Sequence, residues 1–366
     1  MGAQIKVKTD PIFKGIVATL LITGFFILAS ASIGITTSMK APPYYFILRQ
    51  ITMGGAAGLI LFIFAAKFPY KKWKTWALAV FLGSILLTSA VWIPGFGLKA
   101  GGALRWIDLG LLSFQPSEFL KFGFILYLSA WFSSRGGRIS SLKNGLIPFL
   151  IITGVASSLL VLQPDIGTLG VLAISGLFLF LVAGGKFTHV LILILIGLIF
   201  LGILISLEPY RFDRLAVFRN SEYDPQGAGY QARQALIAIG SGGIWGRGFG
   251  MSRQKFQYLP EPVGDSIFAV AAEEFGFIGA SLIIFLFMLL AWRGFYISRF
   301  APDSFGKLLG SGMVLLIIIQ SMINISALSG LVPLTGIPLV FISQGGSSLA
   351  VTLLEAGILL NISKTT

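Results

Sequence analysis

Long apolar runs dominate this sequence of 366 residues, and they restrict its fold more than any other feature. The runs have lengths of about 17–25 residues, at which a helix crosses the ~30 Å hydrocarbon core of a bilayer. Only 11% of the residues are charged, whereas an average soluble domain has roughly 25%. The composition therefore excludes an ordinary cytosolic enzyme and predicts an all-α polytopic membrane protein.

The apolar runs and their charged, proline or glycine borders predict ten membrane spans. The first run starts after about a dozen residues without a small-residue cleavage site, so we interpret it as a retained helix and not as a signal peptide. The whole chain, 1–366, is predicted to form a single integral membrane domain. The predicted spans are 14–34, 46–66, 75–93, 117–132, 145–161, 166–183, 187–206, 266–292, 307–328 and 345–363.

The distribution of Lys and Arg predicts the orientation of these spans. A cytoplasmic N-terminus leaves only Lys40, Lys99 and Arg105 in the short outer loops. Long loops have little influence on orientation, so the segment of about 208–264 is not counted. Both termini are then cytoplasmic, that segment is an extracytoplasmic loop, and the net charge of +13 reflects topology more than a nucleic-acid partner. The basic residues on the inner side are Lys6, Lys8, Lys14, Lys67, Lys71, Lys72, Lys74, Arg135, Arg138, Lys143, Lys186, Arg293, Arg299, Lys307 and Lys364.

Cysteine and histidine usage excludes several kinds of site. The chain has no cysteine, which rules out disulfides, thiolate zinc sites, iron–sulfur clusters and cysteine nucleophiles. Its single histidine, His189, cannot build a multi-histidine metal site alone. The sequence therefore predicts no resident metal.

Unusual polar residues open four of the predicted spans. Glu118 and Lys121 lie in the first turns of span four, Asp165 precedes span six, and Asp265 precedes span eight. A Gly-Gly-Ser-Ser sequence at 345–348 opens span ten. All four spans run from the outside to the inside, so these groups are expected to gather near the outer face, where the long loop can cover them.

Each of these openings also has a purely structural interpretation. An acid in the first helical turn is favoured by the helix dipole, and this alone could explain Glu118 or Asp165. Lys121 needs a partner within an apolar span, and Glu118 supplies one at i−3. Ser347 and Ser348 could serve close packing, or their helix N-terminus could bind a phosphate.

The long loop places basic residues on both sides of its centre. A carboxylate at the membrane boundary beneath such a loop suits chemistry on an anionic lipid head group, but a solvated loop with an acidic helix cap fits equally well. Further along, Glu273 and Glu274 lie about 12 Å down span eight at 1.5 Å per residue, and they favour a transport function. Six of the seven basic residues of the loop form these two groups, namely Arg211, Arg214 and Arg219 before the centre and Arg247, Arg253 and Lys255 after it.

A series of ordered motifs over nearly the whole chain resembles the SEDS family, the FtsW/RodA type of membrane protein. The details at 252–255 and 260–262 look more like the division branch, FtsW, than the elongation branch, RodA. The sequence departs from the family's usual pattern in three places, and these affect the fine geometry that is expected. Gly264 and Ser266 flank Asp265, Gln344 stands where the family usually has Tyr, and Glu355 has no counterpart in the family. The motifs are Gln115-Pro116-Ser117-Glu118 with Lys121, Gln163-Pro164-Asp165-Ile166-Gly167-Thr168, Glu208-Pro209-Tyr210-Arg211, Gly229-Tyr230-Gln231, Tyr258-Leu259-Pro260-Glu261 before Asp265, Glu273-Glu274 with Gly276, Gly330, Pro333, Thr335-Gly336-Ile337-Pro338 and Ile342-Ser343-Gln344-Gly345-Gly346-Ser347-Ser348.

The resemblance implies a peptidoglycan glycosyltransferase that polymerises lipid II at the outer face of the cytoplasmic membrane, for division or elongation. It implies a class B penicillin-binding protein as partner, together with other divisome or elongasome membrane proteins, and a septal location in the division branch. The family's catalytic aspartate maps onto Asp265. The substrate-contact candidates are Lys121, Glu118, Arg211, Arg214, Lys255, Glu261, Ser347 and Ser348.

The expected chemistry assigns roles to these groups. Asp265 is expected to remove the proton from the attacking sugar hydroxyl, while Arg211, Arg214, Lys121 or Lys255 stabilise the leaving pyrophosphate. A divalent cation, Mg²⁺ or Mn²⁺, could bridge the pyrophosphate, although the sequence shows no dedicated cage for it. The alternatives are a lipid II flippase lined by Glu118–Lys121 and Glu273–Glu274, and a non-catalytic divisome scaffold.

Overall fold

The computed structural model describes residues 9–100, 103–108, 110, 113–207, 209–220 and 223–365. Lys6 and Lys8 of the inner basic residues and Glu208 of the loop motif lie outside this part of the chain. The elements are α1 (Pro11–Met39), α2 (Tyr45–Arg49), η1 (Gln50–Ala56), α3 (Ala57–Lys67), α4 (Tyr70–Ser89), η2 (Ala90–Trp92), β1 (Gly97–Ala100), β2 (Ala103–Asp108), β3 (Ser113–Phe114), α5 (Pro116–Arg135), η3 (Gly136–Ser140), η4 (Leu142–Leu146), α6 (Ile147–Leu162), α7 (Ile166–Val182), α8 (Phe187–Leu207), α9 (Pro209–Arg219), α10 (Ala228–Ser241), α11 (Ile267–Arg299), α12 (Ser304–Leu328) and α13 (Gly346–Ile362).

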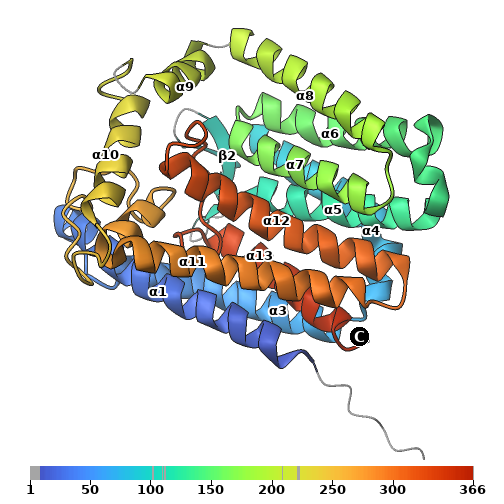
Figure 1. Ribbon diagram of the computed structural model, residues 1–366, viewed down its shortest axis with the longest axis horizontal. Helices are drawn as coiled ribbons and strands as arrows, with labels where there is room; N and C mark the ends of the chain where they lie inside the picture. Colours follow the sequence, from blue (N-terminus) through green and yellow to red (C-terminus); the bar gives the residue numbers. More distant parts are fainter. Residues whose placement is uncertain are drawn as a thin grey trace, which may run out of the picture.

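The long helices lie side by side along one direction (Figure 1), and every predicted span falls on a helix or on consecutive helical segments. Seven helical segments are long and apolar enough to cross a membrane, and two shorter apolar helices, α7 and α13, accompany them. The remaining predicted span is α5, which carries Glu118 and Lys121. The helical, multi-pass membrane architecture is thus confirmed, while the count of ten spans stays a prediction.

A small antiparallel sheet departs from the predicted all-α fold. The order of its strands is β1-β2-β3, and it occupies the short connection between α4 and α5. Arg105 on β2 donates hydrogen bonds to the backbone carbonyls of Gln163 and Pro164 at the end of α6. The sheet therefore ties the α4–α5 connection of the bundle to the α6–α7 connection.

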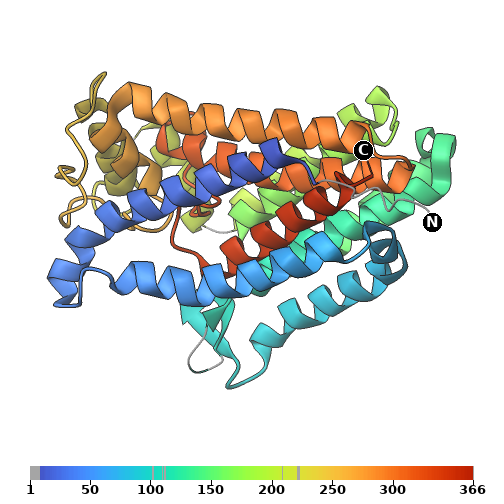
Figure 2. The same ribbon diagram turned by 90° about the horizontal axis from the view of Figure 1, so that it is seen from below.

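Both ends of the described chain lie at one end of the bundle, and the long loop lies at the other (Figure 2). The backbone N–H of Asp10 donates to Ser363 Oγ over 3.1 Å. The carboxylate of Asp10 also forms an ion pair with Arg293, at 2.7 Å, near the end of α11. This arrangement agrees with termini on the same side and a loop on the opposite side.

Helix α11 is broken at Gly276, where φ is 66° and ψ is −165°. This left-handed φ favours glycine, and a Cβ there would lie 2.3 Å from the backbone nitrogen of Gly246. The long loop fills the break with its own backbone: the N–H of Phe277 donates to Gly243 O, and the N–H of Arg247 donates to Glu273 O. The loop is thereby built into α11 and does not merely cover it.

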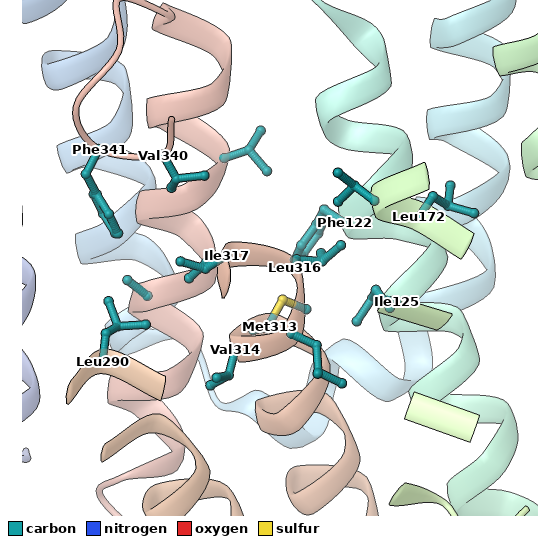
Figure 3. Close-up of a cluster of buried hydrophobic side chains, with 14 of the residues drawn as sticks. Phe122, Ile125, Leu172, Leu290, Met313, Val314, Leu316, Ile317, Val340 and Phe341 are labelled. Carbon is teal, nitrogen blue, oxygen red and sulfur yellow. The ribbon is translucent and has the colours of Figure 1, made fainter. Parts of the chain in front are cut away.

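The apolar core lies around α12, whose side chains are buried along most of its length. Figure 3 shows Met313, Leu316 and Ile317 of α12 directed between Phe122 of α5 and Leu290 of α11. Helix α13 packs closely on α3, where a Cβ at Gly357 would meet the backbone oxygen of Phe62 at 2.6 Å. Small residues allow such close approach of membrane helices, and the rigid core fixes the ends of α5, α7, α12 and α13 relative to each other.

Candidate active site

The backbone on both sides of Asp265 is anchored to the connection between α12 and α13. The side-chain amide of Asn324 donates to Asp265 O over 2.7 Å and to Ile337 O over 2.8 Å. Ser343 Oγ donates to Gly264 O over 2.7 Å, and the N–H of Gln344 donates to Val263 O over 2.8 Å. Asp265 therefore has a fixed position at the start of α11.

The carboxylate of Asp265 is held much more loosely than its backbone. Gln231 of α10 approaches both carboxylate oxygens at 3.4 Å, and no ion pair to Asp265 occurs among the described residues. A Cβ added at Gly336 would lie 3.7 Å from Oδ2 of Asp265. This oxygen therefore faces the backbone of a glycine, where no side chain fills the space. The carboxylate retains free acceptor positions.

Electrostatics adjust the carboxylate toward proton exchange near neutral pH. Burial, together with the negative charge of Glu261, raises the pKa of Asp265 to about 6, against the opposing effects of the Gln231 hydrogen bond and the Arg214 charge. Glu261 itself is exposed. Near pH 7 the Asp265 carboxylate is mainly ionised, and it is a stronger base than an ordinary aspartate.

The two arginines predicted to approach the substrate take different positions on α9. The guanidinium of Arg214 donates to Leu334 O over 3.0 Å, which places it beside the α12–α13 connection and within electrostatic reach of Asp265. The guanidinium of Arg211 donates back to Leu204 O of α8 over 2.9 Å. Of the two, Arg214 is the cation that the fold brings to Asp265.

A second polar cluster lies among α5, α12 and α13. Lys121 forms an ion pair with Glu118 at 2.9 Å and also donates to the side-chain oxygen of Gln320. Gln320 in turn donates to Ser348 Oγ over 3.4 Å, and Glu355 interacts electrostatically with the Glu118–Lys121 pair. The predicted pair is therefore present, and Glu355, which had no assigned partner, has Lys121 as its nearby cation.

Ser347 lies where the starts of two helices meet. Its hydroxyl accepts a hydrogen bond from the backbone N–H of Gln115 over 3.0 Å, which joins the starts of α5 and α13. Asp165 accepts from the N–H and hydroxyl of Thr168. The structure thus uses Asp165 as a helix cap, in agreement with the structural alternative raised from the sequence.

Lys255 and the two adjacent glutamates form a third cluster, which anchors the long loop. The Lys255 ammonium is fully buried and lies 2.8 Å from Glu274 Oε1, and Ser30 of α1 bonds to both groups. Glu273 accepts from the hydroxyl of Ser252 and from the backbone N–H groups of residues 253 and 254. A contact between Lys255 and a pyrophosphate stays a prediction that would require this ion pair to open.

Several residues of the site carry no charge and were not predicted from the sequence. Gln320 and Asn324 are amides four residues apart in an apolar span, so they share one face of α12. This face links the two clusters, because Asn324 bonds to Asp265 and Gln320 bonds to Lys121. The amide spacing was a usable signal, whereas nothing local indicated the partners of Gln231 or Ser343.

Comparisons with known proteins agree with the motifs. The family model described as "Cell cycle protein" and covering FtsW, RodA and SpoVE matches residues 11–366. The chain is 41% identical over 360 residues to stage V sporulation protein E of Bacillus subtilis, covering 98% of each chain. It is 37% identical over 341 residues to a probable peptidoglycan glycosyltransferase FtsW of Geobacter sp. (strain M18), covering 93% of this chain and 92% of the relative.

Solved structures share the whole fold. A chain from a peptidoglycan synthase complex, described as coordinating polymerization and crosslinking, superposes with a TM-score of 0.77 at 26% identity and 97% coverage of both chains. The rod shape determining protein RodA of Thermus thermophilus superposes with a TM-score of 0.71 at 26% identity, covering 99% of this chain and 98% of RodA. The chain described here is thus a multi-pass membrane protein that belongs to the SEDS family of FtsW, RodA and SpoVE.

Proposed function

We propose that this protein is a peptidoglycan glycosyltransferase that polymerises lipid II at the outer face of the cytoplasmic membrane. The observation that carries the proposal is the carboxylate of Asp265, which has a fixed backbone, free acceptor positions and a pKa of about 6. The name of the FtsW relative, a probable peptidoglycan glycosyltransferase, supports the same activity.

In the proposed reaction a sugar hydroxyl of one lipid-linked disaccharide attacks the anomeric carbon of another. The new glycosidic C–O bond forms while the bond from the anomeric carbon to the pyrophosphate oxygen breaks. Asp265 accepts the hydroxyl proton in the transition state, because a hydroxyl is a poor nucleophile near neutral pH. The lipid pyrophosphate leaves as an anion and needs charge stabilisation more than a proton.

Arg214 is the cation that we assign to the developing pyrophosphate charge. It donates to Leu334 O beside the α12–α13 connection and interacts electrostatically with Asp265, whereas Arg211 donates to Leu204 O of α8 and both Lys121 and Lys255 are held in buried ion pairs. Among the described residues no cluster of three or more His, Asp or Glu could hold a metal ion. A divalent cation, Mg²⁺ or Mn²⁺, would therefore have to enter with the pyrophosphate and its oxygens.

The transport alternative depended on Glu118–Lys121 and Glu273–Glu274 lining a path through the membrane. In the structure Glu118 is paired with Lys121, and Glu273 and Glu274 bind the loop backbone, Ser252 and Lys255, so these groups already have protein partners. Asp265, by contrast, directly precedes α11 and is approached by Gln231 of α10, and this start of α11 lies at the end of the bundle that carries the long loop (Figure 1). Its placement favours chemistry on a lipid head group at the membrane surface.

We further propose that the protein works beside a class B penicillin-binding protein, which crosslinks the strands that it polymerises, and with other divisome or elongasome membrane proteins. The solved complex that couples polymerization to crosslinking supports this partner. The relatives named SpoVE and FtsW support a role in division or sporulation over elongation. The septum is the corresponding location in the cytoplasmic membrane.

The experiment that tests the activity uses purified protein in detergent with fluorescent lipid II and no other polymerase. Glycan strands should appear on a gel, and addition of EDTA should abolish them if a divalent cation accompanies the pyrophosphate. A flippase or a scaffold would produce no polymer under these conditions. Absence of polymer from well-folded protein, with Mg²⁺ or Mn²⁺ and with the partner present, would overturn the proposed activity.

A further inference from the structure

A cavity of about 480 Å³ lies at the end of the bundle opposite to Asp265. It is formed by the last turns of α5, α7 and α11, the first turns of α12, and the segment at 136–139. These turns belong to the end where the two termini of the described chain meet. In the predicted orientation the cavity therefore opens at the inner leaflet of the membrane.

The lining of this cavity combines two chemical characters. Its walls are largely apolar, with Phe132, Phe295 and Leu308 among them. Two basic side chains, Arg299 and Lys307, complete the lining, and both are exposed. The cavity thus offers hydrocarbon contact and positive charge to one occupant.

Neither of these two cations is neutralised by the protein. The side chains of Arg299 and Lys307 form no hydrogen bond or ion pair within the part of the chain that the structure describes, and Arg299 lies over the ring of Phe300 at 5.9 Å. Arg293, which is also near the end of α11, is instead paired with Asp10. The basic charge at the cavity is therefore available to an external anion.

The nearby acid does not cancel this charge. Asp303 precedes the cavity residue Ser304, but its carboxylate accepts from the hydroxyl of Tyr70 and from the backbone N–H of Gly306. It therefore serves as the N-cap of α12. Asp303 forms no ion pair with Arg299 or Lys307 among the described residues, and two cations beside one acid leave a net positive charge at the cavity.

We propose that this cavity binds an anionic phospholipid of the inner leaflet, with its phosphate between Arg299 and Lys307 and an acyl chain along the apolar wall. A soluble phosphate would leave the apolar wall uncovered, and a zwitterionic lipid would bring no net charge. Basic pockets between membrane helices on the cytoplasmic side are suited to anionic head groups. The site is remote from Asp265 and independent of the proposed catalytic activity.

The test is native mass spectrometry on delipidated full-length protein, titrated with phosphatidylglycerol or with phosphatidylcholine. Phosphatidylglycerol should bind as one tight adduct at least about tenfold more strongly than phosphatidylcholine, since each basic residue contributes about fivefold. The double variant Arg299→Gln/Lys307→Gln should lose this preference. Lys71→Gln/Lys72→Gln removes the same charge from exposed lysines elsewhere on the predicted inner side and should keep it.

A second pair of variants tests the apolar part of the site. Ser311 lines the cavity and is nearly buried, so Ser311→Phe should fill the cavity and weaken phosphatidylglycerol binding, while Ser311→Ala should not. If Ser311→Phe fails to fold, Val182→Trp, at a half-exposed lining position, makes the same test. Three results would overturn the proposal. They are equal binding losses in both charge variants, an unchanged lipid preference in Arg299→Gln/Lys307→Gln, and displacement of the lipid by inorganic phosphate alone.

Discussion

At the level of single residues, the backbone around Asp265 is fixed far more tightly than its carboxylate. Asn324 and Ser343 bond to the adjacent carbonyl groups at 2.7 Å, whereas Gln231 approaches the carboxylate only at 3.4 Å. A general base benefits from this combination, because its position is preorganised while its lone pairs stay free for the substrate proton.

The first prediction concerns the charge of this base. Asp265→Asn keeps the shape of the side chain but cannot accept a proton near neutral pH, so polymerisation of lipid II should fall by about 10²–10⁴-fold. Folding, measured as the thermal midpoint in detergent, should stay close to wild type. Glu261→Gln, at an exposed position four residues earlier, is the control and should have a smaller effect. Near wild-type polymerisation by Asp265→Asn would move the search for the base to another carboxylate.

The second prediction concerns the pH dependence of the reaction. With a pKa of about 6, Asp265 becomes protonated as the pH falls through 6, so the polymerisation rate should decline on that acid side. Glu261→Gln removes a charge that raises this pKa, so its acid limb should shift to lower pH. Arg214→Gln removes a charge that lowers it, so its limb should shift to higher pH. Profiles of initial rate against pH measure both shifts, and identical limbs in all three proteins would refute the assignment.

At the level of elements, α12 connects the polar clusters to each other. One face carries Asn324, which holds Asp265, and Gln320, which accepts from Lys121. Helix α5 contributes the buried Glu118–Lys121 pair on the other side of that contact. A change in this pair is therefore expected to affect packing among α5, α12 and α13.

The third prediction tests whether the pair is structural. Lys121→Met leaves Glu118 and Glu355 as buried acids without their cation, and breaking a buried pair costs about 3–5 kcal/mol. Lys121→Met/Glu118→Gln should be more stable than the single variant, because one of these acids is removed. Thermal unfolding of both variants in detergent makes the comparison. If both are as stable as wild type and inactive, Lys121 contacts substrate instead.

The fourth prediction concerns the loop built into α11. Glu273 holds the backbone N–H groups of Arg253 and Gln254 through its carboxylate, and hydrogen bonds to a charged group contribute about 1.5–3 kcal/mol each. Glu273→Gln should therefore raise amide hydrogen exchange at 252–255 by at least about tenfold. Glu261→Gln should leave exchange there unchanged. Equal exchange in wild type and Glu273→Gln would show that the carboxylate does not anchor the loop.

At the level of the whole molecule, the bundle places the two proposed sites at its opposite ends. The long loop, the start of α11 and the α12–α13 connection gather around Asp265 at one end. The two termini of the described chain and the ends of α5, α7 and α11 gather at the other. This polarity makes the orientation in the membrane a testable requirement of the proposed function.

The fifth prediction tests this orientation in intact cells. Since the chain has no cysteine, single cysteines can be labelled without background. Gln226→Cys, exposed in the long loop, should react with an impermeant maleimide from outside. Ser134→Cys, exposed at the end of α5, should react only after the membrane is permeabilised. Equal labelling of the two in intact cells would contradict the orientation.

The sequence by itself determined the helical spans, their alternating direction and the gathering of polar openings at one end. These features depend on local quantities, namely the length of an apolar run and the charges beside it. They placed Asp265 and the Glu118–Lys121 pair among the candidate polar groups, and the resemblance to the family then mapped the catalytic aspartate onto Asp265. The ordered motifs sufficed for the family.

Only the tertiary structure decided which distant groups meet. In the sequence, Gln231 is 34 residues and Asn324 is 59 residues from Asp265, and Lys255 is 19 residues from Glu274, yet each pair is in contact. The break at Gly276 and the small sheet before α5 were not predicted either. The physical reason is that a buried polar group must be satisfied by whatever lies beside it in space, and chain packing, not local sequence, selects that neighbour.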